Sequence, residues 1–332
     1  MRNKCKVVPV LAALAAIIMI AAACSGKKAQ AGNVRLVLDW TPNTNHTGLY
    51  VALEKGWFAE EGLRVQIIQP PEDGALALLG SGNVEFAIDF QETMGPAIAK
   101  ADTDRDALPV QAVAAIISHN TSGIMSLART GIRRPRDLMG KRFASWETPL
   151  VTAIIQDMVT RDGGDFNAVT MIPNFATDAF SALATDIDAI WIYYAWDGVA
   201  AEINGITIDY LDLGSINPLF DFYTPIIAAN TNWLNANPET AKRFLRAASR
   251  GYQFAIENPS EAGEILLKHA PELDRALVMR SQEYLAPRYQ GDARRWGEID
   301  PQRWGNFYRW MFERGLLERD IYSGGYTNEY LP

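Results

Sequence analysis

Residues 34–63 have the sequence VRLVLDWTPNTNHTGLYVALEKGWFAEEGL, in which a strand pattern passes into a helix pattern through a polar loop. Val34–Leu38 is a short apolar run typical of a strand. Residues 48–61 carry apolar side chains at helical spacing, and Gly62 ends that pattern. A strand that leads directly into a helix is typical of α/β proteins, in which the loop between them lies at the ligand-binding edge of the sheet.

Strand patterns and helix patterns continue to alternate along the chain, which predicts parallel sheets covered by helices on both faces. The strand patterns are at 64–69, 84–90, 141–146, 169–173 and 187–194, and the helix patterns are at 74–79, 149–161 and 178–184. Because the alternation starts again after residue 121, the sequence predicts two doubly wound lobes.

Two extended apolar runs, 110–118 and 222–229, flank the second set of elements and are interpreted as the two crossings between lobes. The helix patterns at 239–256, 261–268 and 301–314 are expected to pack on the first lobe. We therefore expect an α/β protein with a two-strand hinge, in which lobe 1 is discontinuous (34–119 and 223–332) and lobe 2 is continuous (120–222).

Composition agrees with two globular domains, because the chain has 332 residues, of which 48% are hydrophobic. The mean hydropathy of -0.08 excludes a polytopic membrane protein. A formal net charge of -8 leaves no basic surface for nucleic acid or an anionic membrane. Binding is therefore expected at a local site.

The amino-terminal segment has the plan of a secretory signal peptide, with basic residues in 1–6 and an uncharged apolar stretch over 7–23. A transmembrane anchor is the alternative, disfavoured because the stretch is short, rich in alanine and interrupted by Pro9. Small residues lead into Cys24, which resembles a bacterial lipobox. We expect residues 1–23 to be removed, Cys24 to be lipidated, and 24–33 to be a tether that holds an exported periplasmic or cell-surface lipoprotein.

Polar and aromatic residues gather where strand patterns end, and these are the candidate ligand-binding residues. They are Asp39, Trp40, Asn45 and His46 after the first strand, Glu92 after a first-lobe strand, Trp146 and Glu147 in the second lobe, and Tyr193, Tyr194, Trp196 and Asp197 in an aromatic run. The structural alternatives are a helix N-cap at Asn45 or Thr47, a capping box at Glu147 and Thr148, and core packing of one aromatic row. Strand alternation predicts Trp191 and Tyr193 on one face and Tyr194 and Trp196 on the other.

Such residues suit a planar heteroaromatic ring, which stacks on aromatic faces while a carboxylate accepts two hydrogen bonds from it. No arginine cluster accompanies them, which argues against sulfonate or phosphate as the recognised group. The three histidines, His46, His119 and His269, are too scattered to indicate a metal site, and no catalytic motif is present. We expect no catalytic residues, no metal and no cofactor.

Several segments resemble the solute-binding lipoproteins of ABC importers for thiamine pyrimidine precursors, in the NMT-like group that includes pyrimidine synthases. The segments are 34–63, 188–198 (DAIWIYYAWDG), 222–234 (FYTPIIAANTNWL), 251–262 (GYQFAIENPSEA) and 281–300. The resemblance implies a type II periplasmic-binding-protein fold. It implies a pocket at Asp39, Trp40, Asn45, His46, Tyr50, Tyr193, Tyr194 and Asp197, with Trp146 and Glu147 at a matching strand end.

The resemblance also implies a partner permease with its ATPase, a small heteroaromatic ligand and, in our expectation, a monomer that binds no nucleic acid. Several relatives have glutamate where this chain has Asp197, so the ligand stays open between formylaminopyrimidine, hydroxymethylpyrimidine, thiamine and riboflavin. An enzyme is the competing class. Pyrimidine synthases of the group carry a histidine and a cysteine-rich stretch that binds iron, whereas this chain has two cysteines, Cys5 and Cys24. A structural envelope lipoprotein is the third alternative.

Overall fold

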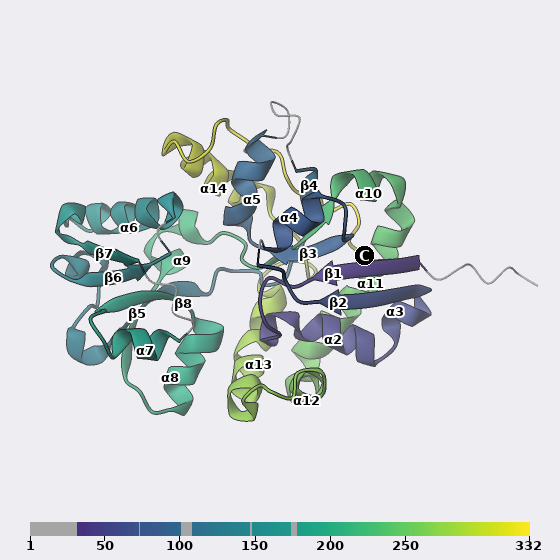
Figure 1. Ribbon diagram of the computed structural model, residues 1–332, viewed down its shortest axis with the longest axis horizontal. Helices are drawn as coiled ribbons and strands as arrows, with labels where there is room; N and C mark the ends of the chain where they lie inside the picture. Colours follow the sequence, from purple (N-terminus) through teal and green to yellow (C-terminus); the bar gives the residue numbers. More distant parts are fainter. Residues whose placement is uncertain (1–31, 73, 101–107, 147, 174–177) are drawn as a thin grey trace, which may run out of the picture.

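The computed structural model describes residues 32–72, 74–100, 108–146, 148–173 and 178–332, so the expected signal peptide and Cys24 lie outside the described residues. The described chain forms two α/β lobes that lie side by side (Figure 1). Within these ranges, no helix combines the length and the apolar character needed to cross a membrane.

Each lobe is built on a five-stranded sheet with the same plan. The first sheet has the order β2-β1-β3-β10-β4 and the second has the order β7-β6-β8-β5-β9. The first-sheet strands are β1 (Gly32–Val37), β2 (Leu63–Ile68), β3 (Phe86–Asp89), β4 (Val110–Ala115) and β10 (Ile226–Asn230). The second-sheet strands are β5 (Ser122–Leu127), β6 (Arg142–Ser145), β7 (Thr170–Pro173), β8 (Ala189–Tyr193) and β9 (Ile208–Asp212).

The prediction of purely parallel sheets was wrong in one respect, because each sheet contains one antiparallel strand. β10 runs antiparallel to β3 and β4, and β5 runs antiparallel to β8 and β9. Both strands enter directly from the other lobe, so neither needs the helical crossover that joins parallel neighbours. A second correction concerns the expected tether, since Gly32 and Asn33 already pair with β2 as part of β1.

The helices cover both sheets. They are α2 (Thr47–Glu54), α3 (Trp57–Glu60), α4 (Ala75–Gly80), α5 (Gln91–Lys100), α6 (Pro149–Arg161), α7 (Ala179–Leu183), α8 (Val199–Ile203), α9 (Leu213–Ile216), α10 (Thr231–Ala236), α11 (Pro238–Glu257), α12 (Pro259–His269), α13 (Arg275–Gln290) and α14 (Pro301–Glu313). The single helix predicted over 48–61 is divided at Gly56, whose φ of 75° is left-handed and ends α2.

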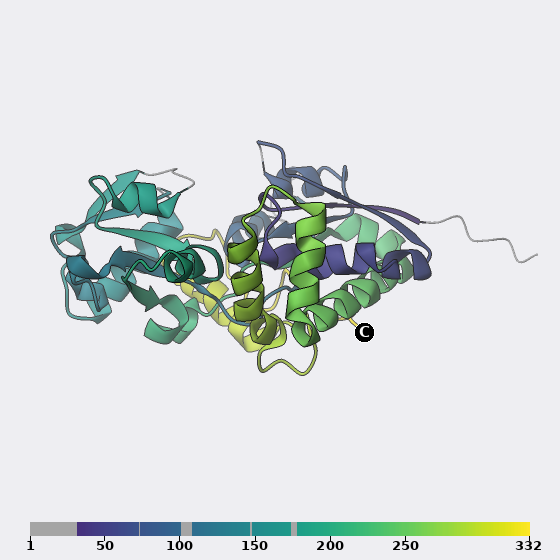
Figure 2. The ribbon, with the colours of Figure 1, turned by 90° about the horizontal axis from the view of Figure 1, so that it is seen from below.

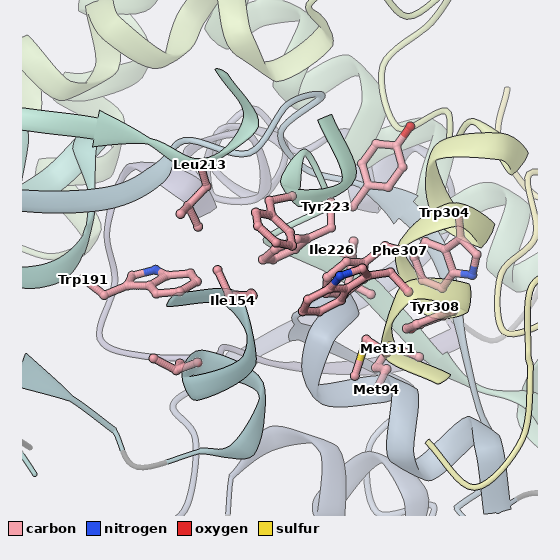
Figure 3. Packing of buried hydrophobic residues seen from close by; sticks show 14 of the residues in the cluster. Met94, Ile154, Trp191, Leu213, Tyr223, Ile226, Trp304, Phe307, Tyr308 and Met311 are labelled. Atoms are coloured by element: carbon pink, nitrogen blue, oxygen red, sulfur yellow. The ribbon is translucent and has the colours of Figure 1, made fainter. Parts of the chain in front are cut away.

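The carboxyl-terminal helices pack on the first lobe, as Figure 2 shows for the green helices. α11 crosses α2 so closely that a Cβ on Gly251 would lie 1.9 Å from the carbonyl oxygen of Gly48. α14 instead lies at the boundary between the lobes. One hydrophobic cluster joins its Phe307 and Met311 to Ile154 and Trp191 of the second lobe, and Figure 3 shows the two sets facing each other.

Two linkers, 116–121 and 213–225, connect the sheets, and a charged cluster ties them together. His119 in the first linker is 2.7 Å from Asp221 Oδ2 through Nδ1 and 2.8 Å from Asp292 Oδ1 through Nε2. Since each ring nitrogen faces a carboxylate oxygen, both nitrogens donate when the imidazole is protonated. Asp221 belongs to the second linker and Asp292 follows α13, so the ring of His119 joins both linkers to lobe 1.

We expect a His119→Gln variant to lose part of the pH dependence of stability. Hydrogen bonding to Asp221 raises the pKa of His119 above its ordinary value. A raised folded-state pKa gives stability that is present below the unfolded pKa of about 6.5 and is lost as the pH rises through the folded value. Thermal unfolding between pH 5 and 9 checks this, with His269→Gln as the control. Equal pH profiles for His119→Gln and wild type would contradict it.

Candidate functional site

A cavity of about 790 Å³ lies between the lobes, at the carboxyl ends of strands from both sheets. Its first-lobe wall comes from the segments after β1 and β3, and its second-lobe wall comes from the ends of β6 and β8. The residues that carry polar or aromatic groups into it are Asp39, Trp40, Asn43, Thr44, Asn45, Phe90, Glu92, Thr93, Thr121, Trp146, Thr148, Trp191, Tyr193, Trp196, Asp197, Phe222 and Thr224. Because the two sheets have the same strand order, their ligand-binding edges lie opposite each other across the cavity.

Side chains of the loop after β1 make hydrogen bonds within the loop itself. Asn43 Oδ1 accepts from the N–H of Asn45 at 2.9 Å, and the N–H of Asn43 donates to His46 Nδ1 at 3.2 Å. Because Nδ1 accepts, the proton of the neutral imidazole resides on Nε2, which donates to Asp39 Oδ1 at 2.6 Å. His46 is fully buried and therefore holds Asp39 at the cavity without facing the cavity itself.

The end of β3 adds two more carboxyl groups to the first lobe. Asp89 accepts from the N–H of Phe90 at 2.7 Å and from the hydroxyl of Thr93, and burial raises its pKa to about 6. Glu92, in the first turn of α5, lines the cavity, and its Oε2 is buried without a hydrogen-bond partner. Burial, together with nearby Asp89, raises the pKa of Glu92 to about 8. Buried polar atoms without a partner are rare in folded proteins, so Glu92 Oε2 is a candidate position for a ligand contact.

The second-lobe wall is aromatic. Trp191 is buried against the core, lines the cavity, and leaves its Nε1–H without a partner. Tyr193 stacks on Phe90 of the first lobe, with ring centroids 6.4 Å apart. Burial raises the pKa of Asp197 to about 6. Trp40 of the first lobe and Trp146 of the second are unusually exposed for tryptophan, at 43% and 41%, and both line the cavity. Each lobe thus offers an accessible indole.

The predicted strand alternation was wrong beyond Tyr193, because β8 ends there and residues Tyr194–Gly198 form a turn of π-helix. The turn brings Trp196 and Asp197 into the cavity but directs Tyr194 away from it. The hydroxyl of Tyr194 donates to Glu202 at 2.8 Å, and its ring lies against Tyr210 and Tyr284. π-helical turns are frequent at functional sites.

The structure brings eight of the predicted site residues together around the cavity: Asp39, Trp40, Asn45, Glu92, Trp146, Tyr193, Trp196 and Asp197. Three others do not line it. His46 lies behind Asp39, Tyr194 packs against other tyrosines, and Tyr50 stacks on His269 of α12 at 5.3 Å. Glu147 lies outside the described residues.

Sequence reasoning missed several lining residues, and they fall into two groups. Trp191 and Thr93 stand within segments that the sequence had already singled out, and the unusual density of aromatic and polar residues was their signal. Thr224 and Met311 come from the second linker and from α14. Their participation depends on how the chain crosses between the lobes, and no local pattern shows it.

The cavity has a clear charge preference. Among its described lining residues there are three carboxyl side chains, Asp39, Glu92 and Asp197, and no lysine, arginine or histidine. Carboxyl groups without basic neighbours attract hydrogen-bond donors or cations. The site therefore suits a ligand with donor groups or positive charge and disfavours an anion.

Contacts beside the cavity hold the lobes in their present arrangement. Arg280 of α13 pairs with Glu202 of α8, with the closest nitrogen and oxygen 2.8 Å apart. Ser281 connects Thr44 of the first lobe to the carbonyl of Ala195 in the second. On the opposite side Arg314 pairs with Asp157 of α6. Rearrangement of these few polar contacts would allow a hinge motion between the lobes.

Two mixed sheets of identical plan, two linkers and a cavity between them define a type II periplasmic-binding-protein fold. The periplasmic aliphatic sulphonate binding protein SsuA from Escherichia coli is a solved structure of this architecture, similar with a TM-score of 0.68 at 14% identity over 87% of this chain and 95% of that one. Within the fold, the pattern of the NMT1/THI5 like family matches residues 43–262. The chain belongs to that family.

Relatives in sequence include both binding proteins and enzymes. A protein of Halalkalibacterium halodurans named formylaminopyrimidine-binding protein is 29% identical over 299 residues, which cover 87% of each chain. A protein of Legionella pneumophila named 4-amino-5-hydroxymethyl-2-methylpyrimidine phosphate synthase is 27% identical over 310 residues, which cover 90% of this chain and 92% of that one. Both names concern a substituted pyrimidine.

Proposed function

We propose that this protein is the extracytoplasmic solute-binding component of an ABC importer and that its cavity captures an aminopyrimidine precursor of thiamine, such as formylaminopyrimidine or hydroxymethylpyrimidine. The carrying observation is the cavity between the lobes, which combines an accessible indole from each lobe with three carboxyl groups and, among its described lining residues, no basic side chain. An aminopyrimidine has a flat ring for the indoles and amino hydrogens for the carboxyl oxygens.

The lining also separates this chain from sulfonate binders of the same fold. A sulfonate needs positively charged or neutral hydrogen-bond donors, whereas the described lining of this cavity carries carboxyl groups and no basic side chain. The names of the family relatives support a pyrimidine instead. Because the volume of about 790 Å³ exceeds that of a single ring, thiamine and riboflavin remain alternatives of the same chemical class.

A pyrimidine synthase is the candidate from another class, and the position of His46 favours a binding protein over it. Both nitrogens of that imidazole are engaged, one by the N–H of Asn43 and the other by Asp39. His46 is also fully buried and does not line the cavity, so it is not placed to contact a substrate.

In the proposed cycle the two lobes separate about the linkers and close on the ligand. Lobe 1 consists of residues 34–119 with 223–332, and lobe 2 consists of residues 120–222. Ligand contacts to both walls favour the closed state, because only that state makes both sets of contacts. The closed form then delivers the ligand to a permease that its ATPase drives. Lipidation of Cys24 would keep a monomeric binding protein beside that permease.

Calorimetric titration with three groups of compounds tests the proposal. We expect saturable one-to-one binding of formylaminopyrimidine or hydroxymethylpyrimidine, weaker or no binding of thiamine and riboflavin, and no binding of an alkanesulfonate or nitrate. If riboflavin binds more tightly than either pyrimidine, riboflavin takes the place of the pyrimidine as the proposed ligand. Binding of a sulfonate, or of none of the compounds, would contradict the proposal.

A further inference from the structure

Glu92 is a half-buried carboxyl group of the cavity lining, and one of its oxygens is fully enclosed. It lies in the first turn of α5, just after Asp89 at the end of β3. The hydroxyl of Thr224, from the second linker, donates to its Oε1 over 3.4 Å, and its Oε2 is buried without any partner. The side chain therefore has one oxygen weakly engaged and one oxygen without a hydrogen-bond partner.

The surroundings of Glu92 contain further acidic groups. Asp89 of the first lobe is a nearby carboxyl group, and Tyr193 and Tyr308 are buried phenols that feel the charge of Glu92. Lysine, arginine and histidine are absent from the described cavity lining. Burial in such surroundings raises the pKa of Glu92 to about 8, so near pH 7 the group is mainly a neutral carboxylic acid.

A carboxylic acid offers one donor and one acceptor at adjacent atoms, whereas a carboxylate offers acceptors alone. We propose that Glu92 recognises the ligand as a neutral acid, whose O–H donates to a ring nitrogen and whose carbonyl oxygen accepts from the adjacent amino group. The inference rests on the proposed function and deepens it, because it selects heteroaromatic rings that present an unprotonated nitrogen beside an amino group.

The opposite wall provides a second group for the same ring. Trp191 Nε1–H is a buried donor without a partner, and it lines the cavity from the second lobe. A ligand that satisfies Glu92 in one lobe and Trp191 in the other removes both unpaired polar atoms only when the lobes are close together. A buried polar atom without a partner destabilises the protein, so a ligand that pairs both atoms is favoured.

The test is calorimetric titration of the full chain with 4-amino-5-hydroxymethyl-2-methylpyrimidine between pH 7 and 9.5. If the acid form binds, wild-type affinity falls about 30-fold over this range, since the proton is lost above pH 8. A Glu92→Gln variant keeps one donor and one acceptor at the same place. We expect it to bind within about threefold of wild type at pH 7, with little further change up to pH 9.5. Glu313→Gln, at an exposed position of α14, is the matched control and should follow wild type.

The outcomes separate this inference from the function on which it rests. Wild-type binding that does not weaken with pH, with a loss of 30-fold or more in Glu92→Gln at pH 7, means that the carboxylate is the recognising form and overturns the inference alone. If the Glu92→Gln variant does not fold, the pH dependence of wild-type affinity alone tests the inference. Absence of wild-type binding at every pH overturns both the inference and the proposed function.

Discussion

An Asp197→Asn variant should bind the pyrimidine about 30- to 100-fold more weakly than wild type while being more stable at pH 7. Asparagine has the shape of aspartate but lacks its charge. A hydrogen bond to a charged group is worth about 1.5–3 kcal/mol, or about 10- to 150-fold in affinity, and the expected loss lies within that range. Calorimetry and thermal unfolding of the same preparation measure the two effects.

The gain in stability follows from the position of Asp197. Burial raises its pKa from 3.8 in the unfolded chain to about 6. A raised folded-state pKa means that stability is lost as the pH rises through that value, so at pH 7 the folded protein bears an enclosed negative charge at a cost. Asparagine avoids this cost and should add about 1–2 kcal/mol at pH 7, but not at pH 4.

Asp186→Asn is the control for this experiment, because Asp186 is 97% exposed and stands on the outer surface of the second lobe in a pair with Arg142. It should change neither affinity nor stability by more than a small amount. A stable Asp197→Asn variant with wild-type affinity would show that Asp197 makes no contact with the ligand.

Two variants of Asp39 should separate its structural role from its binding role. In Asp39→Ala the Nε2–H of His46 loses its acceptor while remaining fully buried, and we expect the free energy of unfolding to fall by about 2–3 kcal/mol. In Asp39→Asn the amide oxygen still accepts from Nε2–H, so the loss should be below about 1 kcal/mol.

Ligand affinity should respond differently from stability in these two variants. Both lack the negative charge of Asp39, so both should bind the pyrimidine at least tenfold more weakly than wild type. Denaturant unfolding and calorimetry measure the two quantities. Equal stability of Asp39→Ala and wild type would contradict the assignment of the Nε2–H tautomer to His46, and unchanged affinity would remove Asp39 from the binding site.

Much of the fold could be predicted from local patterns. The segments that became β1, β2 and β6–β8 have short apolar runs, and α6 begins at Pro149 as its pattern indicates. Several elements were not predicted, among them α5, α13, β5 and β9. In α5, Gly95 and Pro96 interrupt the helical pattern, and β9 is a run of only five residues, in which three are charged or carry a hydroxyl group. The antiparallel direction of β5 and β10 depends on long-range pairing, which local patterns do not show.

The candidate site was predictable where a residue stands directly after a strand, as Asp39, Trp40 and Asp197 do. It was not predictable where a helical turn rotates a side chain away. Tyr50 lies on the far side of the first turn of α2, against His269, and the π-helical turn at 194–198 directs Tyr194 outward. The unpaired atoms of Glu92 and Trp191 appear only when both lobes are in place.

A crystal structure of the protein with 4-amino-5-hydroxymethyl-2-methylpyrimidine tests the central claim most directly. The proposal predicts the ring inside the cavity between the lobes, with hydrogen bonds to carboxyl groups of both walls, Asp39 or Glu92 on one and Asp197 on the other. An indole of Trp40 or Trp146 should cover it. A ring held on the outer surface, or by one lobe while Asp197 and Trp146 remain distant, would contradict the proposal.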